Sequence, residues 1–62
     1  MDKPRLKLVG TDGNAFAILG AAQRVARKAG WDSARIDGLL KEAMSGDYTH
    51  LLATMQQHFR VY

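Results

Sequence analysis

Two short segments with alternating apolar and polar residues stand at opposite ends of the chain, and they constrain the fold more than any other feature. Residues 3–9 read Lys-Pro-Arg-Leu-Lys-Leu-Val, and residues 58–62 read His-Phe-Arg-Val-Tyr. An alternation with a period of two is typical of a half-buried β-strand. Because an isolated strand is not stable, each segment must pair with the other or with a strand of a second copy.

The next segment predicts a helix. Asn14 is a good N-cap residue, because its side chain can accept a backbone N–H of the first turn. Gly30 is a typical stop. Between them, apolar residues follow helical spacing along one stripe, from Ala15 to Ala29. We expect this helix to be the central one of the domain.

Two further helices are predicted after residue 30. Asp32 suits the N-cap of the second helix, where Trp31 can pack on Ile36 as a hydrophobic staple, and residues 45–46 (Ser-Gly) end it. Asp47 suits the N-cap of the third helix, whose apolar residues continue at helical spacing towards the C-terminal strand.

The order strand, helix, helix, helix, strand predicts an α+β fold. Residues 1–62 form a small single domain, with the two terminal strands paired and the helices packed on them. The pattern leaves open whether the strands pair parallel, antiparallel or between chains. Because 62 residues without cysteine offer a small core and no disulfide, a homodimer also stays open.

Residues suited to catalysis or metal binding are scarce. The chain has no cysteine, and its two histidines, His50 and His58, are expected on the solvated surface. Ser33 and Ser45 each fall at a helix end, where capping explains them. We therefore predict no catalytic residue, no metal, no cofactor and no enzymatic activity.

The sequence also predicts a cytoplasmic protein with no membrane partner. The longest apolar stretch, residues 15–22, is far shorter than the ~20 residues that span a bilayer. The N-terminus is basic but lacks the apolar run of a signal peptide. If a phage encodes the protein, we expect it in the host cytoplasm.

Positive charge is concentrated in the first half of the chain. Residues 1–31 contain six Lys or Arg against two Asp, whereas residues 32–62 contain three against four acidic residues. Such a basic half permits an anionic partner. The candidate nucleic-acid-binding residues lie on the outward face of the first strand and on one face of the first helix: Arg5, Lys7, Arg24, Arg27 and Lys28.

A second candidate surface lies on the N-terminal half of the first helix, away from its apolar stripe. It consists of Phe16, Ala17, Gly20 and Ala21 and carries no charge. Small residues of this kind predict close packing of the helix on a second side, within the domain. If the surface is exposed instead, it predicts a partner-binding site.

The loop before the first helix is predicted to be a capped turn. Thr11, Asp12, Gly13 and Asn14 lie where backbone N–H groups attract anions, but the loop has no Lys or Arg and Asp12 would repel phosphate. The same residues are similar to the start of a calcium loop, whose later ligands are missing.

Several stretches of the chain resemble a group of small uncharacterised proteins of phages, plasmids and bacterial genomes. The stretches that carry the resemblance are 8–10 (Leu-Val-Gly), 12–16 (Asp-Gly-Asn-Ala-Phe), 27–30 (Arg-Lys-Ala-Gly), 41–43 (Lys-Glu-Ala), 45–48 (Ser-Gly-Asp-Tyr) and 50–52 (His-Leu-Leu). No established activity comes with that group. The resemblance implies a mobile-element context, in which small proteins commonly act by binding.

Two functions are therefore expected. The first is a non-catalytic binding protein that acts on a host or phage macromolecule, above all a protein, including as an inhibitor of a host defence complex such as an anti-CRISPR. The alternative is a basic DNA-binding regulator, because a strand with outward basic residues followed by two helices is similar to the ribbon-helix-helix proteins. There, Arg5 and Lys7 would face the bases, supported by the basic face of the first helix.

Overall fold

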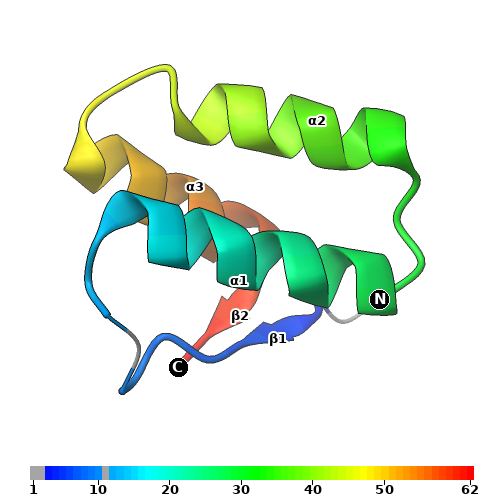
Figure 1. Cartoon of the computed structure of the whole chain (residues 1–62), viewed down its shortest axis with the longest axis horizontal. Helices are drawn as coiled ribbons and strands as arrows, with labels where there is room; N and C mark the ends of the chain where they lie inside the picture. The colour runs from blue at the N-terminus through cyan, green and yellow to red at the C-terminus, as the bar shows by residue number, and fades with distance from the viewer. Residues whose placement is uncertain (1–2, 11) are drawn as a thin grey trace.

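The structure is a computed structural model that describes residues 3–10 and 12–62. Its elements follow the predicted order (Figure 1). They are β1 (Arg5–Leu6), α1 (Ala15–Lys28), α2 (Ser33–Ala43), α3 (Tyr48–His58) and β2 (Arg60–Val61). The α+β fold with paired terminal strands is thus confirmed, whereas Thr11 of the predicted loop lies outside the described residues.

The two terminal strands pair with each other in the parallel direction. Arg5 lies opposite Arg60, and Leu6 lies opposite Val61. A parallel pair requires a long crossover connection, and the three helices supply it. Pairing within the chain therefore uses both terminal strands.

Both strands are shorter than the sequence predicts. His58 is the last residue of α3 rather than the first residue of a strand. The chain turns extended only at Phe59, whose N–H still donates to the Met55 carbonyl at 2.8 Å. Beyond β1, the Leu8 N–H donates to the Tyr62 carbonyl at 2.7 Å. Backbone hydrogen bonds between the two terminal segments therefore continue past the ends of the regular strands.

The elements form three layers (Figure 1). The two-stranded sheet lies on one side, where α1 contacts β1 and α3 contacts β2. The helix α2 packs on both α1 and α3, and within the described chain it contacts neither strand. The first helix is central, as predicted, because it contacts the sheet and both other helices, but α3 shares this position.

The core lies between the layers. It consists of the apolar residues that the helical and strand patterns of the sequence place on the inner faces of the elements. Among the described residues, Thr54 is the one buried polar residue, and its hydroxyl donates to the His50 carbonyl at 2.8 Å. The buried hydrophobic residues are Leu6, Ile18, Ala21, Ala22, Ala26, Ile36, Leu39, Ala43, Leu51, Met55 and Phe59.

The predicted start of each helix and the predicted stop of the first helix are confirmed. Asn14, Asp32 and Asp47 are the N-caps, and each side chain accepts the backbone N–H of the residue three positions later. Gly30 follows α1 with φ of +88°, a conformation that favours glycine. These local signals set where each helix begins and where the first one stops.

Trp31 joins the start of α2 to the end of α3. Its ring stacks on that of Phe59, with 5.3 Å between ring centroids and 11° between planes. The Arg35 guanidinium lies 3.8 Å from the Trp31 centroid. The half-buried indole therefore packs between a core aromatic ring and a surface cation.

Candidate functional site

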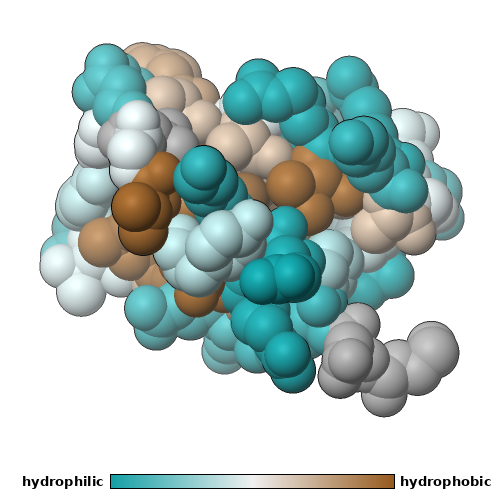
Figure 2. Space-filling model, turned by 90° about the horizontal axis from the view of Figure 1, so that it is seen from below, coloured by the Kyte–Doolittle hydropathy of each residue, from teal (hydrophilic) through white to brown (hydrophobic). Residues whose placement is uncertain are grey.

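A groove of about 670 Å³ opens between β1 and the C-terminal half of α1. Its apolar lining comes from Leu6, Ala21 and Val25. Leu6 and Ala21 belong to the buried core, so the groove reaches the edge of the core. Figure 2 views the molecule from the side of the strands and shows apolar surface framed by hydrophilic side chains. Ligand sites in proteins commonly measure about 300–1,000 Å³.

Four exposed cationic side chains line the same groove. Lys7 follows β1, whereas Arg24, Arg27 and Lys28 lie on the last turns of α1. Among the described residues, no acidic side chain lines it. The structure thus brings together four of the five basic residues that the sequence singled out. We call this site, with its apolar lining of Leu6, Ala21 and Val25, the basic groove.

Arg5, the fifth predicted residue, lies outside the basic groove. Leu6 points inward, so Arg5 points to the outer face of the sheet, next to its strand partner Arg60. Its guanidinium lies 5.1 Å from the ring centroid of Tyr62. Two like charges on neighbouring strands repel each other, and the contact with the Tyr62 ring offsets part of that cost.

The cations of α1 are not neutralised by any acidic residue that the structure describes. Arg24, Arg27 and Lys28 form no ion pair with any residue that the structure describes. The acidic residues that the structure describes lie elsewhere: Asp12 precedes α1, Asp32, Asp37 and Glu42 lie at the start of α2 or along it, and Asp47 precedes α3. The basic groove is therefore a region of positive potential at the side of the molecule that carries the strands.

The uncharged surface on α1 does not pack as the sequence predicts. Phe16 is 84% exposed, so the expectation that it packs on a second side of the helix is wrong. Ala17 and Gly20 are half-buried, and Ala21 is buried beneath the basic groove. No helix or strand that the structure describes covers the Phe16 side chain. The sequence predicts a partner-binding site if this surface is exposed. The part that meets this condition is Phe16, with the half-buried Ala17 and Gly20 beside it.

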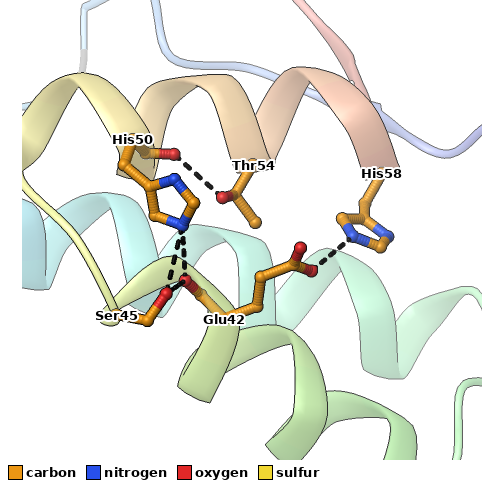
Figure 3. A network of polar contacts seen from close by, with 5 residues as sticks. All are labelled: Glu42, Ser45, His50, Thr54 and His58. Atoms are coloured by element: carbon orange, nitrogen blue, oxygen red, sulfur yellow. Dashed lines mark hydrogen bonds and ion pairs between the residues drawn. The ribbon is translucent and has the colours of Figure 1, made fainter.

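A second group of polar side chains lies where α2 meets α3 (Figure 3). The Ser45 hydroxyl donates to the Glu42 carbonyl oxygen at 2.7 Å. His50 Nε2 lies 2.9 Å from the same carbonyl oxygen and 3.2 Å from Ser45 Oγ. His58 Nε2 lies 3.2 Å from Glu42 Oε1. We call Glu42, Ser45, His50 and His58 the α2–α3 clasp.

Ser45 and His50 are the residue types of a nucleophile and its general base, but their hydrogen bonds do not run in the direction that this role requires. A base must accept the serine proton at its ring nitrogen. The Glu42 carbonyl oxygen can only accept, so the His50 Nε2 that faces it carries a proton and donates. The Ser45 hydroxyl donates to the same oxygen. Both side chains thus bond to the C-terminal end of α2, where the Glu42 carbonyl also accepts the Ser45 backbone N–H at 3.1 Å.

The prediction that both histidines are solvated surface residues is correct only in part. Each is half-buried and each has a partner. The His58 ring also meets the Trp31 ring edge-on, with centroids 6.2 Å apart and planes at 70°. Sequence reasoning missed these contacts because Glu42 lies on a different helix from both histidines, and no periodicity within one helix signals them.

The loop before α1 is held by its own contacts. Asn14 Oδ1 accepts the Ala17 N–H at 2.8 Å, and the Tyr48 hydroxyl donates to the Gly13 carbonyl. The cap predicted at Asn14 is present, and the bond from Tyr48 ties the preceding residue to α3. Within residues 3–10 and 12–62, no three His, Cys, Asp or Glu side chains gather as metal ligands. The described helices also include none long and apolar enough to cross a bilayer.

Comparison of the chain with protein-family models, with curated proteins and with solved structures finds no match.

Proposed function

We propose that the protein is a non-catalytic binding module that binds a macromolecular partner, a protein, through the basic groove. The observation that carries this proposal is the combination of an apolar lining with three cations of α1, Arg24, Arg27 and Lys28, that form no ion pair with a described residue. Binding sites on proteins combine an apolar cavity with a few convergent polar groups in this way.

A purely structural reading explains only part of this charge. Arg27 and Lys28 lie in the last turn of α1, where the helix dipole favours cations. Arg24 lies one turn earlier, and Lys7 comes from the other side of the groove. Helix stabilisation does not account for cations from two elements meeting over the same apolar surface, whereas an anionic partner does.

The lining favours a protein over a nucleic acid as the partner. Phosphate contacts require cations but no apolar surface, and single strands are usually stacked on aromatic rings. The basic groove offers Leu6, Ala21 and Val25 and no aromatic ring. Action on a host defence complex, in a mobile-element context, is the specific form of this proposal and derives from the sequence resemblance alone.

DNA binding is the second candidate, and one observation favours it. Arg5 and Arg60 lie side by side on the outer face of the sheet, next to the groove that Lys7 lines. Against it, ribbon-helix-helix proteins build their DNA-reading ribbon from strands of two copies, whereas β1 here pairs with β2 of its own chain.

A salt titration separates the two candidates. A DNA binder that uses five basic residues would show a slope of log K against log salt of about −4 to −5, because each neutralised phosphate contributes about −0.9. We expect only weak duplex binding with a shallow slope. Micromolar binding at physiological salt with the steep slope would overturn the protein-partner proposal.

An affinity capture from host lysate tests directly for a partner protein. It uses the wild type and a matched pair of variants. Arg27→Glu reverses a charge in the basic groove, and Lys41→Glu reverses one in the same position of another helix, the last turn of α2. We expect nuclease-resistant partner protein on the wild type and on Lys41→Glu, and its loss on Arg27→Glu. Equal capture by both variants would contradict the groove as the site.

A further inference from the structure

We propose that the basic groove takes a short, extended acidic peptide segment, which places one aliphatic side chain on the apolar lining and flanking carboxylates on the cations. This inference rests on the proposed function and names the element of the partner that is recognised. The occupant is a linear segment of chain rather than the flat surface of a folded protein.

Charge complementarity points to an acidic occupant. Arg24, Arg27 and Lys28 have no ion-pair partner among the described residues. They follow one another at i, i+3 and i+4, so their like charges repel and destabilise the free helix. Carboxylates placed between them relieve this repulsion, and hydrogen bonds to charged groups are stronger than neutral ones.

The dimensions of the groove point to a short segment. Its lining on α1 runs from Ala21 to Lys28, and at a rise of 1.5 Å per residue this stretch is about 10 Å long. An extended peptide advances about 3.3 Å per residue, so three or four residues cover that length. Successive side chains of an extended peptide point to opposite faces, so the aliphatic residue shares its face with acidic residues two positions before and after it.

The chemistry of the lining points to an aliphatic anchor. Val25 is the half-buried apolar side chain of the lining, Leu6 and Ala21 are buried beside it, and none of the three has a side-chain hydrogen-bonding group. A polar side chain placed there would lose its bonds to water without replacement. A Leu, Ile or Met side chain instead gains by leaving water, at about 25 cal/mol per Å² of buried apolar surface.

The experiment uses the whole chain and a defined probe. The probe is the fluorescein-labelled peptide Gly-Asp-Glu-Leu-Asp-Glu-Gly, with binding followed by fluorescence anisotropy and located by NMR shifts of the labelled protein. We expect saturable binding with shift changes confined to the basic groove. Arg24→Gln combined with Arg27→Gln should weaken it by about tenfold or more, as loss of charged hydrogen bonds does, whereas Lys41→Gln should leave it unchanged.

Three altered probes test each part of the proposal. We expect weaker binding when serine replaces the leucine and when Asn and Gln replace the acidic residues. A five-nucleotide oligothymidine carries four phosphates to match the four carboxylates, and we expect it to bind more weakly than the peptide. Equal binding of the serine peptide or of the oligothymidine would overturn the inference, because charge alone would then explain it.

The outcomes also separate this inference from the proposed function. If a partner protein is captured in the Arg27-dependent manner but no peptide binds, the inference is wrong and the proposed function stands. If tight duplex binding with a steep salt dependence appears, both are wrong. Groove shifts that depend on protein concentration without peptide would assign the groove to a second copy and overturn the inference.

Discussion

The α2–α3 clasp and the basic groove both gather polar or charged side chains, and they differ in where those groups find partners. In the clasp, Ser45 and His50 bond to the Glu42 carbonyl, and His58 faces the Glu42 carboxylate. In the groove, the cations of α1 have no acidic partner among the described residues. Polar groups that satisfy one another stabilise the fold, whereas like charges gathered over apolar surface weaken the free protein and are suited to a ligand.

This comparison also separates residues that a sequence search would treat alike. A serine with a histidine is an obvious catalytic candidate, and yet in the clasp both donate to one carbonyl oxygen. Surface Lys and Arg residues are usually solvated and unremarkable, and yet in the groove they line an apolar hollow. The clasp should therefore govern stability, and the groove should govern binding.

The largest expected effect is on the aromatic packing beside the clasp. Replacing Trp31 with Ala removes the ring that stacks on Phe59 and meets His58. Because the ring is half-buried rather than fully buried, we expect a loss of about 2–3 kcal/mol in the free energy of unfolding. Urea unfolding measures it, and Trp31→Phe should recover part of the loss. A change below ~0.5 kcal/mol would show that the indole does not support this region.

A smaller loss is expected when a methyl group is forced into the clasp. A Cβ at Gly46 would lie 2.8 Å from both Cβ and Cγ of His50, which cannot move without disturbing α3. Overpacking of this kind costs about 1–3 kcal/mol, so Gly46→Ala should lower the urea midpoint accordingly.

Gly38→Ala is the matched control for that substitution. A Cβ at Gly38 meets nothing within 4 Å, and alanine is favoured over glycine within a helix by up to ~1 kcal/mol. We expect the control to raise stability while Gly46→Ala lowers it. If both substitutions raised the urea midpoint, the His50 ring would not be held as the clasp requires.

The smallest effect on stability is expected in the basic groove. Arg24→Gln combined with Arg27→Gln removes charges that repel each other and a weak interaction with the helix dipole, so the two changes nearly cancel. The free energy of unfolding should change by less than ~0.5 kcal/mol in urea, the usual range for surface substitutions. A loss above ~1 kcal/mol would mean that these arginines act as structural residues, like those of the clasp.

Much of the fold could be predicted from the sequence because its signals are local. The caps at Asn14, Asp32 and Asp47 and the stop at Gly30 act within one turn of a helix. The alternation at both ends predicts strands, although it could not show that α3 continues through His58. At His58 the sequence fits both an alternating strand pattern and the last turn of a helix. In the structure this residue is helical, and the Phe59 N–H still bonds to the Met55 carbonyl.

The candidate site could be predicted only in part. The basic residues of the first strand and the first helix were visible in the sequence, but their separation was not. Lys7 joins the α1 cations in one groove, whereas Arg5 points to the outer face of the sheet and contacts Tyr62. The sequence could not show that Leu6 lines the groove, because the alternating pattern identifies this residue only as part of the core.

By itself, the sequence determined the helices, their ends, the two strand segments and an excess of cations in the first half, because each depends on neighbours within a few residues. The tertiary structure decided the parallel pairing, the clasp around the Glu42 carbonyl and the meeting of β1 with α1 over an apolar surface. Those features join residues far apart in the chain. Their geometry follows from how the layers pack, and no local pattern encodes it.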